Sequence, residues 1–174
     1  MTISLRELNE LSAARAAELF TACCGAPRWV SSMVARRPFQ SLDDVFGAAD
    51  DVWWSLDQHD WRDAFARHPR IGEIDAAPPA DERERTWAAS EQAGIATAQD
   101  AVRNALVEAN REYERRFGYV YIVNATGRTA DEMLALARGR LHNSPKVELR
   151  VAAEELRKIT QVRLEKLLVG EPHR

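Results

Sequence analysis

The sequence predicts an all-α, single-domain bundle of about eight or nine helices over residues 1–174, with one extended connecting segment. Two observations support this fold class. Apolar residues recur at helical spacing along most of the chain, and helix-starting and helix-stopping residues separate the periodic stretches. Only residues 117–125, Phe-Gly-Tyr-Val-Tyr-Ile-Val-Asn-Ala, are strongly β-prone, and a lone segment has no strand to pair with. We therefore expect that segment to be extended and buried, outside any sheet.

Start and stop signals divide the periodic stretches into helices. Four expected helices begin after a residue whose side chain can accept a hydrogen bond from the first turn: Ser12, Ser41, Thr97 and Thr129. Glu132 completes a capping box with Thr129, and Pro145 predicts the first turn of a final helix that reaches about residue 168. Gly94 is interpreted as a helix end.

Composition is that of an ordinary globular protein and argues against several classes of function. Apolar residues make up 45% of the chain and charged residues 29%. The net charge of −3 gives no broad attraction to nucleic acid, and no apolar run reaches the length of about 18 residues that spans a membrane. Residues 1–7 lack the basic and apolar regions of a signal peptide, so we expect a cytosolic protein.

Neither disulfide nor metal chemistry is expected. Cys23 and Cys24 are adjacent, and on one helix they would point about 100° apart, which disfavours a bridge between them. The sequence contains no C-x-x-C and no H-E-x-x-H pattern. We expect two reduced cysteines in or near the core, and no metal site.

One histidine has a setting that suits catalysis. Residues 65–73, Phe-Ala-Arg-His-Pro-Arg-Ile-Gly-Glu, end a helical pattern and turn on a glycine. Because the following proline disfavours helical backbone at His68, we expect its imidazole at a helix-to-loop junction. Histidine titrates near neutral pH and can give or take a proton there. The alternative is a histidine that merely caps the C-terminus of a helix.

A carboxylate and an arginine could complete a site without a cofactor. Such a site needs a cation that holds an anionic substrate and groups that stabilise the charge developed in the reaction. Glu91 lies at an irregular polar helix end, and Arg157 and Arg163 lie on the last helix, about 240° apart. The alternatives are a solvated glutamate and a surface arginine paired with a glutamate nearby.

Four stretches, in this order and spacing, carry a resemblance to a known family: residues 29–30 with 37–39, residues 68–72, residues 91–95 and residues 117–123. The last helix adds residues 153–159 and 163–164. From about residue 8 to residue 168 the chain resembles 2-oxo-4-hydroxy-4-carboxy-5-ureidoimidazoline (OHCU) decarboxylases, which catalyse the last step from urate to allantoin.

The resemblance implies an all-helical enzyme without a cofactor, often a homodimer, that converts the small molecule OHCU to (S)-allantoin. It implies His68 as the acid/base group, Glu91 as the carboxylate, and Arg163 rather than Arg157 as the arginine, all three lining one cavity. It also implies substrate contacts from Pro69, Ser90 and Gln92 and from the extended segment at Tyr121, Ile122, Val123, Asn124 and Ala125.

Two positions depart from the family pattern. The family often has a serine three residues before the glutamate, where this chain has Ala88, so either Ser90 replaces that hydroxyl or a substrate contact is lost. Ile71 is bulkier than the small residue that is common before the glycine of the histidine motif. Neither departure removes a charged group, so we expect activity.

Two other functions compete with the decarboxylase. One is a non-catalytic helical interaction module, for which exposed aromatic side chains around Trp53 and Trp54 would dock a partner. The other is a related enzyme that processes ureides or imidazolines on the same scaffold.

Overall fold

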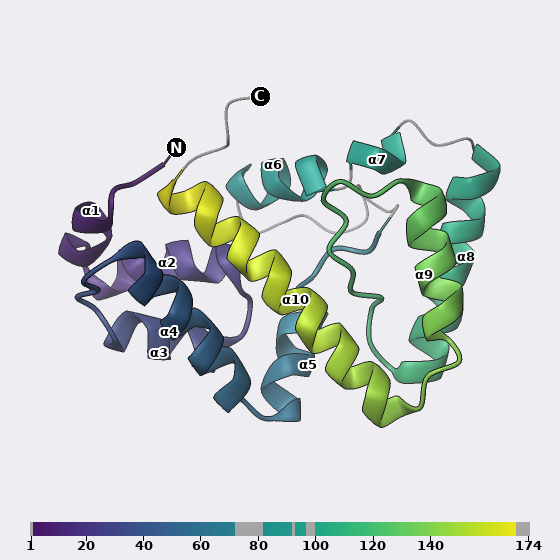
Figure 1. Cartoon of the computed structure of the whole chain (residues 1–174), viewed down its shortest axis with the longest axis horizontal. Helices are drawn as coiled ribbons and strands as arrows, with labels where there is room; N and C mark the ends of the chain where they lie inside the picture. Colours follow the sequence, from purple (N-terminus) through teal and green to yellow (C-terminus); the bar gives the residue numbers. More distant parts are fainter. Residues whose placement is uncertain (1, 72–81, 92, 97–99, 170–174) are drawn as a thin grey trace. The chain divides into compact units, whose positions relative to one another are not determined.

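Helices are the regular secondary structure in the part of the chain that the structure describes. The structure, a computed structural model, describes residues 2–71, 82–91, 93–96 and 100–169. Its elements are α1 (Leu5–Glu10), α2 (Ala13–Cys23), α3 (Pro27–Ala35), α4 (Leu42–Ser55), α5 (Gln58–Ala66), α6 (Glu82–Glu91), α7 (Ala93–Ala96), α8 (Asp100–Phe117), α9 (Ala130–Arg140) and α10 (Pro145–Leu168) (Figure 1). Within these ranges there is no strand, which confirms the all-α class, and nine of the helices are longer than the four-residue α7. None of the described helices is both long and apolar enough to cross a membrane.

Most of the expected helix starts are confirmed. The side chains of Ser12, Ser41 and Thr129 each accept a hydrogen bond from a backbone N–H of the first turn, and Pro145 is the first residue of α10. The interpretation of Gly94 as a helix end is wrong, because α7 runs through it; a glycine inside a helix costs only about 1 kcal/mol relative to alanine. Thr97 lies outside the described residues.

The chain divides into two compact units. The first contains residues 1–64 and 157–174, and the second contains residues 65–156. Helices α5 and α10 each begin in one unit and end in the other. The expectation of one domain over the whole chain stays a prediction.

Tryptophan side chains form much of the core of the first unit. Trp29 and Trp53 are 0% and 1% exposed, and the ring of Phe20 meets that of Trp29 edge-on, with centroids 5.8 Å apart. Trp61 packs against Trp53 and Trp54, with centroids 6.1 and 5.8 Å apart. The expectation of an exposed aromatic surface at Trp53 is therefore wrong, because burial of this large ring stabilises the core.

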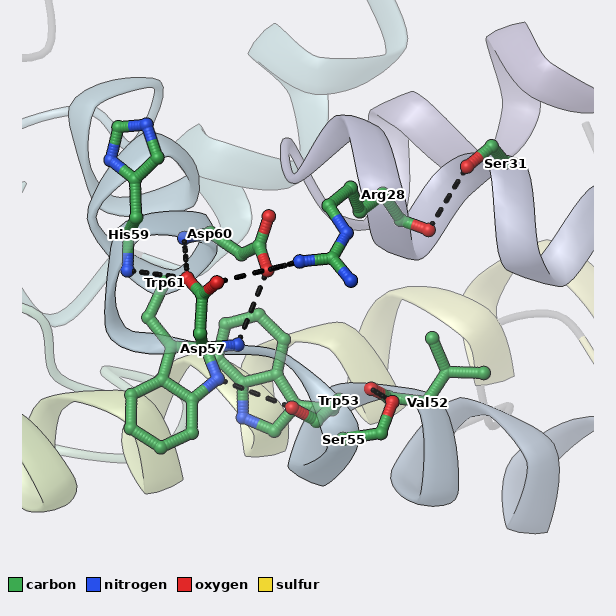
Figure 2. A network of polar contacts seen from close by, with 9 residues as sticks. All are labelled: Arg28, Ser31, Val52, Trp53, Ser55, Asp57, His59, Asp60 and Trp61. Atoms are coloured by element: carbon green, nitrogen blue, oxygen red, sulfur yellow. Dashed lines mark hydrogen bonds and ion pairs between the residues drawn. The ribbon is translucent and has the colours of Figure 1, made fainter.

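Two aspartates fix the start of α5 (Figure 2). The carboxylate of Asp57 accepts hydrogen bonds from the N–H groups of His59 and Asp60 at 2.8 and 3.1 Å. These two bonds hold the pKa of the Asp57 carboxyl below its ordinary value, and the bond from Asp60 has the larger effect. Asp60 in turn accepts from the N–H of Asp57 at 3.2 Å and from Arg28 at 2.8 Å. The reciprocal bonds satisfy backbone donors at the beginning of the helix that leads to His68.

Both cysteines are free and buried, as expected from the sequence. Cys24 is 1% exposed, and burial raises the pKa of its thiol to about 11, against the opposing hydrogen bond from Ala26 and the charge of Arg163. A thiol in this state is a small core side chain and a poor nucleophile.

We expect Cys24, in a Cys23→Ala background, to react with a disulfide reagent about 100-fold more slowly in the folded protein than in guanidinium at pH 8. The two-unit rise in the pKa from 9.0 to about 11 lowers the thiolate fraction by that factor. Because the folded pKa is raised, the contribution of this thiol to stability is present below pH 9 and is lost as the pH rises towards 11. Equal rates of reaction of Cys24 with the disulfide reagent in the folded protein and in guanidinium would contradict the burial of Cys24.

The core of the second unit contains the extended segment, as the sequence predicts. Residues 118–129 between α8 and α9 form no helix and no strand, and Tyr121 and Ile122 are 1% and 0% exposed. Rings cluster at the start of the segment, where Tyr113 of α8 lies 5.8 Å from Tyr119 and 5.1 Å from Tyr121, centroid to centroid. Helices α8 and α9 pack side by side in this unit (Figure 1).

Candidate active site

His68 lies at the helix-to-loop junction that the sequence predicts. Helix α5 ends at Ala66, and the N–H of His68 donates to the carbonyl of Phe65 at 3.0 Å, which closes the last turn. The His68 side chain is half-buried. Three residues before it, the buried ring of Phe65 packs on Tyr119 at a centroid distance of 5.1 Å. The loop of His68 therefore lies beside the start of the extended segment.

Two contacts tie the loop after His68 to α8. Asn110 donates to the carbonyl of Ile71 at 2.7 Å within the core, and the guanidinium of Arg70 makes a two-point ion pair with Glu114 at 2.6 and 3.0 Å. The Ile71 side chain is 2% exposed, so the bulkier residue at this family position fills core space. Bonds at the His68 N–H, at Arg70 and at the Ile71 carbonyl therefore hold the backbone that carries the imidazole of His68.

The two contacts differ in what they contribute to stability. Asn110→Ala leaves the buried carbonyl of Ile71 without its donor, and we expect a loss of about 1–3 kcal/mol in the free energy of unfolding. Arg70→Gln removes a solvent-facing ion pair, and we expect a loss of about 0–1 kcal/mol. Urea unfolding followed by circular dichroism measures both, and a larger loss for Arg70→Gln would contradict this ranking.

Glu91 is the last residue of α6, and its side chain is 7% exposed. Trp87, one turn earlier on the same face, is 8% exposed, whereas Ser90 is exposed. The interpretation of Glu91 as a solvated glutamate is therefore wrong. A buried carboxylate is costly unless polar groups surround it, so this position is typical of a working or structural polar site. Gln92 and the side chain of Ala88 lie outside the described residues.

Side chains, instead of a neighbouring strand, satisfy the backbone of the extended segment. The carbonyl of Ile122 accepts from Arg140 at 2.7 Å, and the N–H of Asn124 donates to Glu155 at 2.8 Å. The carbonyl of Asn124 accepts from Arg128 at 3.0 Å. These bonds explain how a lone segment can be buried without a sheet. The expected substrate-contacting residues of this segment are Tyr121, Ile122, Val123 and Ala125, which are buried, and Asn124, which is half-buried.

A buried ionic network supports that segment, and the sequence analysis missed it. Arg140, 8% exposed, donates through Nε and Nη2 to Glu148 at 2.8 and 2.6 Å, and Glu148 is fully buried. Asn143 donates to the other carboxylate oxygen at 2.7 Å, and the hydroxyl of Tyr113 also donates to Glu148. A signal was present: Glu148 stands four residues before Ala152 in the apolar stripe of α10, where a charge requires a buried partner.

Within this ion pair, the guanidinium of Arg140 keeps its positive charge next to the aromatic rings. Burial alone would lower the pKa of the Arg140 guanidinium, but the hydrogen bond and charge of Glu148 outweigh it and the pKa is raised. Burial raises the pKa of Tyr121 to about 12, although Arg140, 4.8 Å above its ring, opposes the rise. Both groups therefore keep one protonation state across the physiological range.

Arg163 lies in the buried stripe of α10, in the first unit. It is 7% exposed and stands between Ile159 and Leu167, one turn away on either side, which are 2% and 0% exposed. Its Nη1 donates to the carbonyl of Ala22 at 3.3 Å, at the C-terminal end of α2, where a cation is favourable. The interpretation of Arg163 as a surface arginine is therefore wrong. Arg157 is bound to Asp50 at 2.9 and 3.0 Å.

His68, Glu91 and the extended segment thus belong to the second unit, and Arg163 belongs to the first. A hollow of about 510 Å³ over α9 is lined by none of the predicted site residues; its lining is Arg128, Glu132, Ala135, Leu136, Gly139, Arg140 and Asn143. The convergence of the three predicted catalytic side chains in one cavity stays a prediction.

Comparison with known proteins decides the family. The model of the family described as OHCU decarboxylase matches residues 9–165. The chain belongs to the OHCU decarboxylase family. The resemblance recognised in its motifs is thereby confirmed.

Relatives of this OHCU decarboxylase family member include proteins named as bifunctional and proteins named for the decarboxylase alone. The uric acid degradation bifunctional protein TTL of Arabidopsis thaliana is 34% identical over 146 residues, which are 83% of this chain and 45% of that protein. The 2-oxo-4-hydroxy-4-carboxy-5-ureidoimidazoline decarboxylase of Amia calva is 28% identical over 173 residues, 95% of each protein. The chain spans less than half the length of the bifunctional relatives that it matches.

A solved structure of the family has the same fold. A crystal structure of OHCU decarboxylase in the presence of (S)-allantoin matches with a TM-score of 0.73 at 31% sequence identity. The match covers 86% of this chain and 96% of the other.

Proposed function

We propose that this protein decarboxylates 2-oxo-4-hydroxy-4-carboxy-5-ureidoimidazoline to (S)-allantoin in urate degradation. The main support for the proposal is the family match over residues 9–165, together with the 31% identical OHCU decarboxylase whose crystal structure was determined in the presence of (S)-allantoin. The half-buried His68 and the buried Glu91 and Arg163 support it, because each has the chemical character that this reaction requires.

The substrate is an oxygen-rich planar ring that carries a carboxylate. In the proposal the guanidinium of Arg163 holds its anionic oxygens, since a planar cation with several N–H donors suits that task. Backbone groups of the extended segment hold the rest of the ring. The contacting residues of the proposal are Pro69, Ser90, Gln92, Tyr121, Ile122, Val123, Asn124 and Ala125.

His68 acts in two steps, at two neighbouring ring carbons. Its imidazole hydrogen-bonds near the hydroxyl and carboxylate groups while the bond to the carboxylate breaks and CO2 leaves. The electron pair of that bond forms a double bond to the ring carbon that bears the ureido group, and the imine nitrogen accepts the displaced pair together with a proton from solvent. A proton then adds to one face of the ureido-bearing carbon while the hydroxyl on the other carbon releases its proton and becomes a carbonyl, which gives the S product; His68 is the proposed donor to carbon, because a neutral-pH acid/base group suits the transfer.

Glu91 orients the substrate in this mechanism. A buried carboxylate accepts hydrogen bonds from ureido or ring N–H groups, and such bonds are stronger in a site from which water is excluded. The ring imine takes up the electrons, so the proposed chemistry uses no cofactor. The proposal also includes a homodimer located in the cytosol, which sedimentation analysis and cell fractionation can test.

A stereochemical assay tests the proposed function. Substrate is generated in the cuvette by enzymatic oxidation and hydrolysis of urate, and circular dichroism follows the formation of optically active allantoin. We expect the protein to accelerate the step and to give the S enantiomer. Formation at the spontaneous rate would refute the proposal; tight binding of a protein partner would then favour the interaction module, and another ureide product would favour a related enzyme.

A further inference from the structure

The ionic network of the second unit bonds directly to the backbone of the extended segment. Nη1 of Arg140 donates to the carbonyl of Ile122 at 2.7 Å, while Nε and Nη2 of the same guanidinium donate to Glu148. One planar group therefore joins a fully buried carboxylate to one peptide of the segment. The position of that peptide depends on the position of the guanidinium.

Because the peptide between Ile122 and Val123 is planar, the bond from Arg140 to the Ile122 carbonyl also fixes the direction of the Val123 N–H. The only cis peptide bond of the described chain joins Arg37 and Pro38, so the peptide between Ile122 and Val123 is trans. In a trans peptide the carbonyl and the N–H point in opposite directions. Because the Ile122 carbonyl points at Arg140, the Val123 N–H points away from the network. A cation at the carbonyl oxygen also strengthens the N–H of the same peptide as a donor.

The two peptides that follow are also held by side chains. The N–H of Asn124 donates to Glu155 at 2.8 Å, and the carbonyl of Asn124, in the next peptide, accepts from Arg128 at 3.0 Å. Among the described residues, no protein acceptor takes the Val123 N–H. The segment thus presents Val123 N–H on the side opposite to the one that these partners hold.

Stability alone is a poor explanation of the network. A buried ion pair loses so much hydration that well-packed apolar side chains of similar volume are often at least as stabilising. Here both oxygens of Glu148 are occupied, by Arg140 and Tyr113 on one and Asn143 on the other. Such complete bonding fixes the direction of the guanidinium, which an apolar core would not do.

We propose that Arg140 is a positioning residue that aims the Val123 N–H at the substrate through its bond to the Ile122 carbonyl. The inference rests on the proposed function, in which this segment contacts the substrate. A donor held in place before the reaction stabilises developing charge without reorganisation, and a displacement of about 1 Å can cost about 100-fold in rate.

Arg140→Lys tests this role while it keeps the cation beside Glu148. A single ammonium group cannot replace the two N–H donors that Arg140 directs at one oxygen of Glu148 and hold the Ile122 carbonyl as well. We expect kcat to fall about 10- to 100-fold, while circular dichroism shows native helix content at the assay temperature. We also expect the ¹H–¹⁵N resonance of the Val123 amide to shift upfield in the free variant and to respond less to added (S)-allantoin.

Arg37→Lys is the matched control. Arg37 also holds backbone carbonyls, those of Leu8 and Leu11, both at 2.8 Å, but in the first unit. We expect this variant to lose stability and to keep kcat within about twofold. If Arg140→Lys does not fold, Asn143→Ala, which removes one bond to Glu148, replaces it, with a smaller change expected in the same direction.

The outcomes separate the two proposals. A folded Arg140→Lys variant with wild-type kcat, or an unchanged Val123 amide resonance in the free variant, overturns the positioning role and leaves the proposed function intact. Equal losses of kcat in Arg140→Lys and Arg37→Lys would also overturn it, because the effect would then follow stability. A wild-type protein that does not accelerate the reaction refutes the proposed function, and the amide resonance still tests the effect of Arg140 on Val123.

Discussion

Replacement of His68 by asparagine is expected to lower kcat by about 100- to 10,000-fold, the usual contribution of a general acid/base group. Asparagine keeps a hydrogen-bonding side chain at the junction but cannot transfer a proton near neutral pH. The fold is expected to survive, because the His68 side chain is half-buried and the core contacts of its loop come from Phe65, Ile71 and Asn110. The stereochemical assay gives the rate, and thermal melting checks the fold.

His59→Asn provides the control for this substitution. His59 is exposed near the start of the same helix, where its backbone N–H donates to Asp57 at 2.8 Å. We expect its kcat to equal that of the wild type. A His68→Asn variant with near-normal turnover and unchanged (S)-selectivity would remove this imidazole from the mechanism. Near-normal turnover with a loss of (S)-selectivity would restrict it to the final protonation.

The helical fold could be predicted because its determinants are local. Ser41 caps α4 and Thr129 caps α9 through side chains that bond within the next three residues, and the apolar spacing of each helix is readable in one stretch. The start of α7 at Ala93 could not be placed, since a single glycine, Gly94, is tolerated within a helix as well as at its end. The extended segment was predicted from the absence of any partner strand.

The polar site was predictable only where a residue type and its neighbours are unusual. The proline after His68 fixes a junction, so its position followed from the sequence. The burial of Glu91 and Arg163 did not, because periodicity places a side chain on a face and does not say what covers that face. The partners Arg140 and Glu148 belong to different helices, and their pairing depends on the turn between them.

Replacement of Arg163 by lysine is expected to raise KM and weaken (S)-allantoin binding by about 10- to 100-fold. A hydrogen bond to a charged group contributes about 1.5–3 kcal/mol, which converts to roughly that range of affinity. Lysine keeps the positive charge at this 7%-exposed position but offers one ammonium group instead of a planar fork. Calorimetric titration with (S)-allantoin measures the affinity, and steady-state kinetics separate KM from kcat.

Arg157→Lys on the same helix discriminates between the two arginines. Its guanidinium is bound to Asp50 at 2.9 and 3.0 Å, and lysine can keep a single contact with that carboxylate. Because a partly exposed ion pair contributes little, we expect a loss of at most about 1 kcal/mol in stability and unchanged affinity for (S)-allantoin. A larger loss of affinity in Arg157→Lys than in Arg163→Lys would transfer the anion-holding role to Arg157 and would make Arg163 a structural cation at the end of α2.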